Sequence, residues 1–168
     1  MKTTHFTELE SPIGLLRLCG TERGLTGLFM EMHRHGPESN DLRDWQRDDD
    51  LFEEARTQLN DYFAGHRKTF ELAVDRDALG GTTFQRRVWS ELEKIPYGAT
   101  ISYGELARRI GNLNAVRAVG LANGRNPLSI VVPCHRVIGT NGTLTGYGGG
   151  LERKRWLLDF ERGDALIQ

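Results

Sequence analysis

The sequence predicts an α+β protein with a small α/β domain over residues 1–78 and a helical domain over residues 82–168. Alternating, strand-like patterns dominate residues 3–32, and helical periodicity dominates after residue 82. The charge balance also changes sign. Residues 1–81 hold 10 Lys and Arg against 16 Asp and Glu, whereas the remainder holds 12 against 7. This asymmetry indicates that the C-terminal half meets an anionic partner.

Length and composition are those of an ordinary soluble globular protein. The 168 residues are 38% hydrophobic and 27% charged, which suffices for a real core. No apolar run approaches the roughly 18 residues of a membrane span, and the N-terminus lacks the apolar core of a signal peptide. Two cysteines, Cys19 and Cys134, are too few for a disulfide scaffold. We therefore expect a cytoplasmic protein that does not associate with membranes.

The first strands form a predicted β-meander. Thr3–Thr7 and Leu15–Cys19 flank Ser11–Gly14, whose Pro and Gly favour a turn. A second turn at Thr21–Gly24 leads to a third strand, Leu25–Met30.

The next segment, His33–Asp50, is polar and is expected to be a loop. Its histidines, His33 and His35, could bind a metal together with the aspartates at 48–50. No further Cys or His completes a known ligand spacing, so we predict a solvated loop and no metal site.

An amphipathic helix is predicted over Leu51–Phe63, with Gly65 as its stop signal. Phe70–Val74 alternates as a strand, and Asp75–Gly81 is the expected linker. The first half contains no obvious reactive group, so we expect it to act as a scaffold.

Three helices are predicted next. Thr82 and Thr83 are candidate N-caps for a helix over Phe84–Lys94, and Ser102 caps a second over Tyr103–Ile110. After a tight turn at Gly111–Leu113, a third helix runs from Asn114 to about Gly124. Two helices joined by a short Gly-containing turn have the dimensions of a helix-turn-helix.

The third helix is poor in long polar side chains before Arg125, apart from Arg117. Its small residues are Ala115, Ala118, Gly120 and Ala122. A helix that reads the major groove would present Asn, Gln or Arg to base edges. A bare helix instead suits close approach to the minor groove. The alternative is a small-residue face packed on another helix.

An apolar run, Leu128–Val132, lies between two prolines and is expected to be a short buried strand or extended segment. It leads to Cys134, which His135 and Arg136 follow directly. Adjacent basic groups favour the nucleophilic thiolate. Neighbouring side chains on an extended chain point in opposite directions, so His135 can act only where the chain bends or a water intervenes. The alternative is a buried cysteine that acts as a small hydrophobe.

These motifs together resemble one family. The sequence Pro-Cys-His-Arg-Val at 133–137, after Asn126-Pro127 and before Thr-Gly-Tyr-Gly-Gly-Gly at 145–150, resembles the O6-alkylguanine-DNA alkyltransferases. The start of the Tyr103 helix, the Arg117 helix and the segment Trp156–Glu161 match in order and spacing. The resemblance is strong over 82–162 and weaker over 1–81. It implies a ribonuclease H-like N-terminal domain and a winged helix-turn-helix-like C-terminal domain.

The resemblance implies a DNA repair protein, a methylated-DNA–protein-cysteine S-methyltransferase. Such a protein reverses O6-alkylguanine damage, and we expect O4-alkylthymine damage as well, by irreversible transfer of one alkyl group to Cys134. It would bind double-stranded DNA through the minor groove with the damaged base flipped out. No cofactor is implied, and we expect a monomer in the absence of DNA. Some members hold zinc in the N-terminal domain, but no matching Cys and His set occurs here.

The resemblance also implies roles for five residues. Cys134 would be the nucleophile, His135 would take its proton through a water, and Glu161 would orient His135. Asn126 would fix the chain turn. Tyr103 would donate to guanine N3 as the base leaves.

The remaining roles concern the substrate and the DNA. The backbone carbonyls of Cys134 and Val137 would hold the exocyclic amine, and Tyr147, Gly148 and Gly149 would close over the alkyl group. Some members have Ser beside this tyrosine, whereas here Gly148 and Gly149 follow Tyr147. We therefore expect a more mobile lid. Arg117 would fill the space vacated by the flipped nucleotide. Further DNA contacts are expected from Ala115, Ala118, Gly120, Ala122, Arg125 and Arg136.

Two alternatives remain at this point. One is a non-catalytic damage-recognition protein on the same scaffold, although relatives of that kind replace the cysteine that Cys134 supplies here. The other is a Cys-His hydrolase unrelated to DNA, which would turn over many times instead of stopping after one event.

Overall fold

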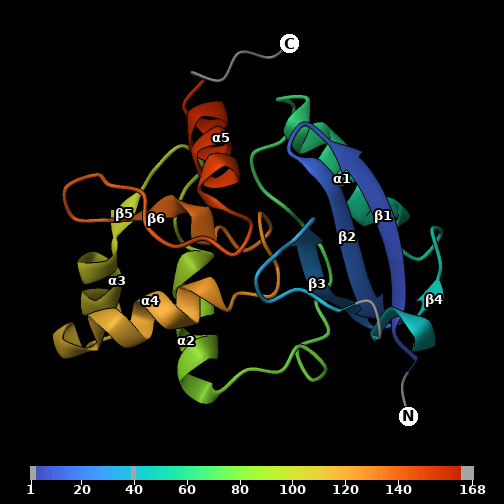
Figure 1. The fold of residues 1–168 in the computed structure, drawn as a ribbon, viewed down its shortest axis with the longest axis horizontal. Helices are drawn as coiled ribbons and strands as arrows, with labels where there is room; N and C mark the ends of the chain where they lie inside the picture. The colour runs from blue at the N-terminus through green and yellow to red at the C-terminus, as the bar shows by residue number, and fades with distance from the viewer. Residues whose placement is uncertain (1–2, 39–40, 164–168) are drawn as a thin grey trace. The chain divides into compact units, whose positions relative to one another are not determined.

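The computed structural model describes residues 3–38 and 41–163. The chain divides into two compact units, Met1–Gly80 and Gly81–Gln168 (Figure 1). The α+β class predicted from the sequence is confirmed, with a sheet in the first unit and mainly helices in the second. None of the helices within the described residues is both long and apolar enough to cross a membrane.

The first unit is built on a four-stranded sheet with the order β3-β2-β1-β4. Its strands are β1 (His5–Ser11), β2 (Gly14–Thr21), β3 (Gly24–Met30) and β4 (Gln46–Arg47). The predicted meander of β1, β2 and β3 is confirmed as two antiparallel pairs. The loop prediction for 33–50 was wrong in part, because the segment holds a 3-10 helix, η1 (Asp41–Asp44), and β4 pairs parallel to β1.

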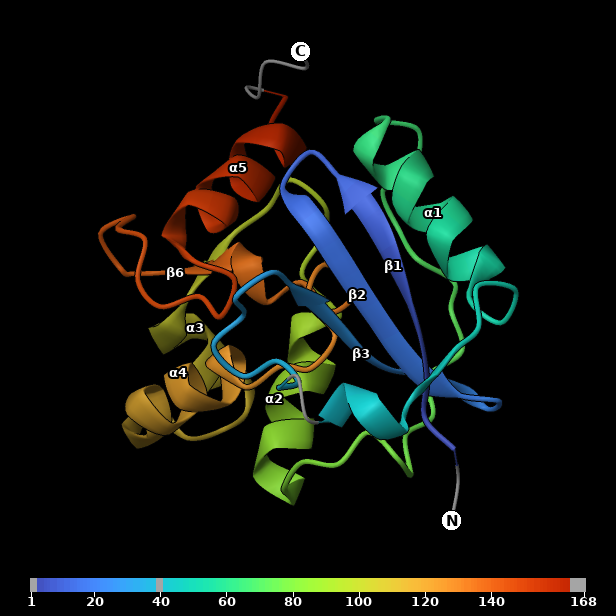
Figure 2. The same ribbon diagram turned by 45° about the vertical axis from the view of Figure 1, so that its right-hand side comes forward.

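Helix α1 (Glu53–Phe63) lies beside β1 in both views (Figure 2). Leu59 and Tyr62 lie on its buried face and are fully buried. The predicted strand over Phe70–Val74 was wrong, because only a single bridge, between Leu25 and Val74, forms there. The Glu71 N–H donates to Gln58 Oε1 at 2.9 Å, and Gln58 Nε2 donates to the Glu71 carbonyl at 3.1 Å. These backbone groups are therefore not available to pair with a neighbouring strand.

In the second unit, α2 (Thr83–Leu92) begins at the predicted cap. The Gln85 backbone N–H donates to the Thr82 hydroxyl at 3.1 Å, and the Thr82 N–H donates to the Gln85 side chain at 2.9 Å. This reciprocal pair is a capping box. α3 (Tyr103–Arg109) begins at Ser102, whose hydroxyl accepts from the Glu105 N–H at 3.0 Å, as predicted.

The predicted third helix forms in two parts, a 3-10 turn, η2 (Leu113–Ala115), and α4 (Val116–Gly124). α4 lies against α2 and α3, which gives the helix-turn-helix its core (Figure 1). Val119 on α4 and Leu106 on α3 are both fully buried. The small residues of α4 lie on both sides of the helix, since Ala122 is buried and Ala118 is exposed.

The chain then enters a buried turn, where the predicted strand over Leu128–Val132 was wrong. The Val132 N–H donates to the Leu128 carbonyl at 2.8 Å, and Ile130 has a φ of +73°. A strand would need an external partner for these groups, whereas the turn satisfies them locally.

The reactive motif follows this turn as a 3-10 helix, η3 (Cys134–Arg136). β6 (Val137–Ile138) then pairs parallel with β5 (Ile101–Ser102), and the chain ends its described part in α5 (Leu151–Glu161). The motif is thus followed directly by a strand of the small sheet, and Glu161 at the end of α5 contacts its His135 and Arg136.

Candidate active site

Cys134 lies at the first position of η3, and only 4% of the residue is exposed. Burial raises the pKa of its thiol, while a hydrogen bond from the Asn126 side chain and the charge of Lys154 oppose that rise. The net direction is upward, so the thiol is protonated at neutral pH. A nucleophilic role therefore needs a nearby base.

Asn126 closes the turn that precedes Cys134. Its Nδ2 donates to the Val132 carbonyl at 2.8 Å, and its Oδ1 accepts from the Leu128 N–H at 3.1 Å. The residue is 2% exposed, so both bonds are made away from water. Since both ends of the amide are engaged, an apolar side chain could not hold this turn.

His135 is fully buried, and its Nε2 lies 2.9 Å from Oε2 of Glu161. Burial lowers the pKa of His135, against the raising effect of Glu161, so the ring is neutral at pH 7. A neutral ring that faces a carboxylate carries its proton on Nε2 and donates it to Glu161. His135 Nδ1 has no hydrogen-bond partner among residues 3–38 and 41–163, so it is free to accept a proton.

Glu161, at the end of α5, is ionised. Burial alone would raise the pKa of this carboxyl. The hydrogen bonds from His135 and Arg136, together with their charges, lower it by more, so the net pKa lies well below the usual range. Arg136 binds the carboxylate through two bonds, Nε to Oε1 at 2.8 Å and Nη2 to Oε2 at 2.9 Å. Glu161 is therefore fixed on both oxygens.

The predicted DNA contact for Arg136 needs correction. The residue is 6% exposed, and its remaining Nη1 donates to the Ile95 carbonyl at 2.7 Å. Its guanidinium is thus committed to buried partners, and it orients Glu161 instead of facing solvent.

Lys154 on α5 is fully buried and belongs to this site, although it was not among the residues predicted from the sequence. Its Nζ donates to the Thr145 carbonyl at 3.0 Å and to the Tyr103 hydroxyl at 3.4 Å. Burial lowers the pKa of Lys154 to about 8, while the nearby Cys134 raises it. The available signal was its position seven residues before Glu161, which places both on one face of a helix.

Tyr103, the first residue of α3, reaches the same Thr145 carbonyl as Lys154. Its hydroxyl donates to the Thr145 carbonyl at 2.9 Å, and the Lys154 Nζ lies 5.6 Å from its ring centre. Burial raises the pKa of Tyr103, so the phenol keeps its proton. The structure thus brings Tyr103, Lys154 and the 145–150 segment together.

Asn123 was also missed. It lies on the buried face of α4 with 2% exposure, and its Nδ2 donates to the Cys134 carbonyl at 3.3 Å. That carbonyl also accepts from the Val137 N–H. The prediction that it holds a substrate amine needs correction, because it already accepts two hydrogen bonds. An Asn within an Ala-rich helix was the available signal.

The predicted lid lies in an irregular segment before α5. The Tyr147 hydroxyl is buried, and burial raises its pKa well above the usual value. The Tyr147 carbonyl accepts from the Gly150 N–H at 3.0 Å, and the Gly149 carbonyl accepts from Arg153 at 3.1 Å. Gly148 is half-buried, and Val137 is fully buried in β6.

The predicted DNA-binding residues of η2, α4 and the position after α4 differ in exposure. Arg117, Ala118 and Arg125 are exposed, and Ala115 and Gly120 are half-buried. Ala122 is 2% exposed and packs inward, so its prediction as a DNA contact needs correction. Helical spacing puts it on the side of α4 that faces the core, with Val119.

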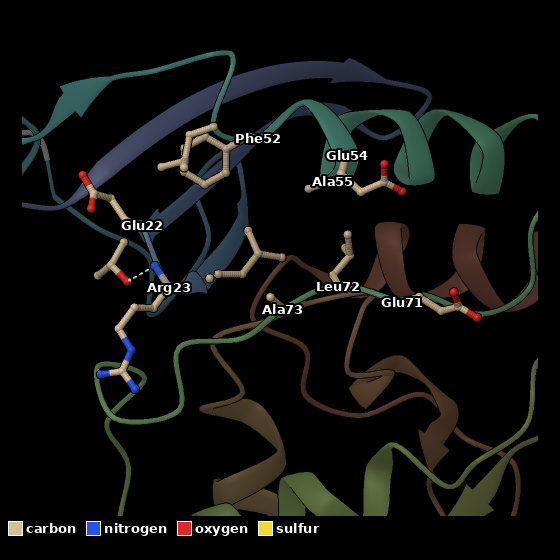
Figure 3. Close-up of a pocket in the computed structure, with 12 residues that line it drawn as sticks. Glu22, Arg23, Phe52, Glu54, Ala55, Glu71, Leu72 and Ala73 are labelled. Atoms are coloured by element: carbon tan, nitrogen blue, oxygen red, sulfur yellow. Dashed lines mark hydrogen bonds between the residues drawn. The ribbon is translucent and has the colours of Figure 1, made fainter.

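The first unit has a hollow of about 230 Å³ between the β2–β3 turn and α1. Figure 3 shows Phe52, Ala55 and Leu72 around it, with Arg23 at one end. Its lining holds no Cys or His. This hollow therefore contains neither a thiol nor an imidazole, the two groups that Cys134 and His135 supply in the second unit.

Comparison with known proteins decides the family. The family model described as the ribonuclease-like domain of 6-O-methylguanine DNA methyltransferase matches residues 4–76. The model described as the DNA binding domain of the same protein matches residues 83–163. The chain belongs to this family.

Individual relatives cover nearly the whole chain. A methylated-DNA–protein-cysteine methyltransferase from Mycobacterium bovis is 51% identical over 161 residues, which cover 96% of this chain and 94% of that protein. One from Methanosarcina acetivorans is 49% identical and covers 94% and 97%. The crystal structure of Mycobacterium tuberculosis OGT in complex with DNA is 50% identical, covers 97% and 96%, and has a TM-score of 0.87. The resemblance found in the sequence is thereby confirmed.

Proposed function

We propose that this protein repairs DNA by transferring the alkyl group of O6-alkylguanine to its own Cys134, once per molecule. The observation that carries the proposal is the buried Cys134 at the start of η3, followed by the His135–Glu161 pair. The high identity to named methyltransferases over nearly the whole chain supports it. O4-alkylthymine is the expected second substrate. We place the protein in the cytoplasm and expect a monomer without DNA.

The proposed reaction is a single displacement at the alkyl carbon. The Cys134 sulfur forms a bond to that carbon as the bond from carbon to guanine O6 breaks. The thiol proton passes through a water molecule to His135 Nδ1, the ring nitrogen that Glu161 leaves free. The resulting imidazolium is stabilised by the Glu161 carboxylate, as in a catalytic triad. Arg136 holds that carboxylate in place.

Tyr103 is the proposed acid for the departing base. Its hydroxyl would donate to guanine N3, which neutralises the charge that develops as O6 loses its alkyl group. In this structure the hydroxyl donates to Thr145, so the 145–150 segment must release it first. The buried Lys154 ammonium would stabilise both the Tyr103 oxygen and the Cys134 thiolate. Asn126 keeps the turn before Cys134 closed.

We assign base binding and DNA binding to neighbouring parts of the same unit. The Val137 carbonyl would accept from the exocyclic amine, and Tyr147, Gly148 and Gly149 would cover the alkyl group. Arg117 would occupy the space of the flipped nucleotide, with α4 in the minor groove. Residues 82–168 would thus form the DNA-binding and alkyl-acceptor domain, and residues 1–78 the scaffold. No cofactor is needed, because the acceptor is the chain's own thiol.

Intact mass spectrometry tests the proposal. The protein is mixed with an equal amount of a duplex that contains one O6-methylguanine, and with an unmodified duplex as control. We expect a gain of one methyl group per chain, located in the Cys134 peptide, with no second turnover.

Two outcomes would overturn the proposal. Binding of the damaged duplex with no change of mass would favour a damage-recognition protein. No binding and no transfer would leave the Cys-His pair as the centre of a different reaction.

A further inference from the structure

The outer side of the η2–α4 segment carries an alternating row of leucine and arginine. Leu113, Arg117, Leu121 and Arg125 follow at four-residue spacing and are all exposed. Residues four apart are neighbours on a helical surface. We call these four residues the Leu–Arg row. The leucines of this row were not among the residues predicted from the sequence to contact DNA.

The two leucines are unusually open to solvent. Leu113 is 67% exposed and Leu121 is 74% exposed, whereas the inner side of the same helix buries Val119 completely. Val116, beside the row, is also 39% exposed. Large apolar side chains gathered on an open surface are typical of a binding site.

The arginines of the row are available to an anion. Within residues 3–38 and 41–163, the side chains of Arg117 and Arg125 form no ion pair and no hydrogen bond. By contrast, Arg108 and Arg109 on the preceding helix, α3, both bind Glu105. Free cations beside apolar side chains suit a surface that combines phosphates with apolar sugars and base edges.

The partner that fits this combination is the minor groove of duplex DNA. Proteins that bind there insert apolar wedges, often Leu, between base steps and place Arg in the groove or on phosphates. The half-buried Gly120 and the small Ala118 let the backbone of α4 come close. A protein partner would be expected to cover the leucines without needing both free arginines.

We infer that Leu121 is a second element inserted into the minor groove, one helical turn beyond Arg117. The two positions lie about 6 Å apart along the helix, which is the length of roughly two base steps. Arg117 fills the space of the flipped nucleotide, and Leu121 packs on the sugars and base edges next to it and holds the bent duplex open. This inference rests on the proposed function, because it supposes that α4 enters the groove of damaged DNA.

Binding measurements on variants test the inference. Leu121→Ala removes the wedge, Leu121→Gln replaces it with a polar group of similar length, and Leu121→Met keeps an apolar side chain. All three substitutes are good helix formers, and thermal melts check that each variant folds. Leu51→Ala, at a half-exposed leucine of the first unit, is the matched control. Affinity for a duplex with O6-methylguanine is measured at several salt concentrations.

We expect Leu121→Ala and Leu121→Gln to bind about tenfold more weakly, with the wild-type dependence on salt, because an apolar contact releases no counterions. Leu121→Met should bind like the wild type, and so should Leu51→Ala. Arg117→Ala should instead reduce the salt dependence.

Wild-type affinity in both Leu121→Ala and Leu121→Gln would overturn the inference while methyl transfer by the wild-type protein still supports the proposed function. If the wild type transfers no methyl group, the proposed function fails first, and the wedge fails with it. A changed salt dependence in the Leu121 variants would also contradict an apolar role.

Discussion

The two units bury one cysteine each, and the contrast between these residues explains where the chemistry lies. Cys19 on β2 and Cys134 on η3 are both 4% exposed, so burial does not distinguish them. Burial raises the pKa of Cys19 to about 11, and its sulfur accepts a hydrogen bond from Thr26 at 3.7 Å. Gly27 also packs closely against it.

Cys134 has the same exposure but different neighbours. The Asn126 amide and the Lys154 charge act on its sulfur, and His135, whose ring pairs with Glu161, follows it directly in the chain. The comparison teaches that a reactive thiol depends on the polar groups placed around it, and that burial alone makes a cysteine inert.

The same contrast extends to the two cores. In the first unit the buried Asp75 accepts hydrogen bonds from two neutral groups, the Thr21 hydroxyl and the Ala78 N–H. The second unit buries Glu161 and Arg136 in one charged cluster with His135, and it buries Lys154 as well. A buried charge is costly unless every partner is in place, so the second unit depends far more on individual side chains.

The largest expected effect separates the two cysteines. Cys134→Ser should abolish methyl transfer, because a hydroxyl is a far poorer nucleophile at this carbon than a thiolate. Cys19→Ala should transfer one methyl group per chain like the wild type. Both are measured by intact mass with a duplex that contains O6-methylguanine. Transfer by Cys134→Ser would show that the acceptor is another residue.

The second prediction concerns the charged cluster. Glu161→Gln removes the carboxylate that pairs with His135 and Arg136, which leaves a buried guanidinium without its counter-charge. We expect the free energy of unfolding to fall by about 3 kcal/mol. The rate of a single methyl transfer should fall by about 100-fold, because His135 loses the group that orients it.

Urea denaturation and single-turnover kinetics measure these two effects. Glu105→Gln is the matched control, since this carboxylate holds two arginines at the surface of α3. Exposed pairs contribute little to stability, so the control should change neither quantity substantially. Equal effects in the two variants would show that the buried cluster has no special role.

The third prediction concerns the spent protein. A methyl group on the sulfur of Cys134 adds volume to a closely packed site beside the Asn126 turn. We expect the methylated protein to be less stable by about 2 kcal/mol, which corresponds to a decrease in Tm of roughly 5 °C. Thermal melts of the free and methylated forms measure it. An equal or higher Tm after methylation would show that the site has room for the group.

The smallest expected effect concerns Lys154. Lys154→Met removes a buried cation and should slow methyl transfer about tenfold, because the Tyr103 oxygen and the Cys134 sulfur lose a nearby positive charge. The pKa of Lys154 is about 8 in the folded chain and 10.5 at its ordinary value. Between these values the unfolded chain binds more protons, so rising pH stabilises the folded state through Lys154.

The difference between the free energies of unfolding of wild type and Lys154→Met isolates this residue, since the other titrating groups are common to both. It should shift in favour of the wild type from about pH 8 to 10.5, as followed by urea denaturation. A difference that stays constant over this range would mean that Lys154 has an ordinary pKa in the folded protein.

Several parts of this protein follow from the sequence because they depend on local signals. The β-meander follows from alternation and turn residues, and the starts of α2 and α3 follow from the hydroxyl caps Thr82 and Ser102. The family follows from residues that stand close together in the chain around Cys134.

Other features depended on partners distant in the chain. The Gln58 side chain that binds the backbone of Glu71 lies 13 residues before it, so periodicity could not predict that contact. The role of Arg136 changed for the same reason, because its partner Glu161 lies 25 residues further on. Only the tertiary structure could show that Lys154 shares a site with Tyr103.

The family resemblance, the nucleophile candidate and the order of the elements could be predicted from the sequence, because each depends on residues that are neighbours in the chain. The tertiary structure decided which charges are buried, which nitrogen of His135 is free and which side of α4 is open. Burial and pairing are properties of groups brought together from distant positions, and no local pattern encodes them.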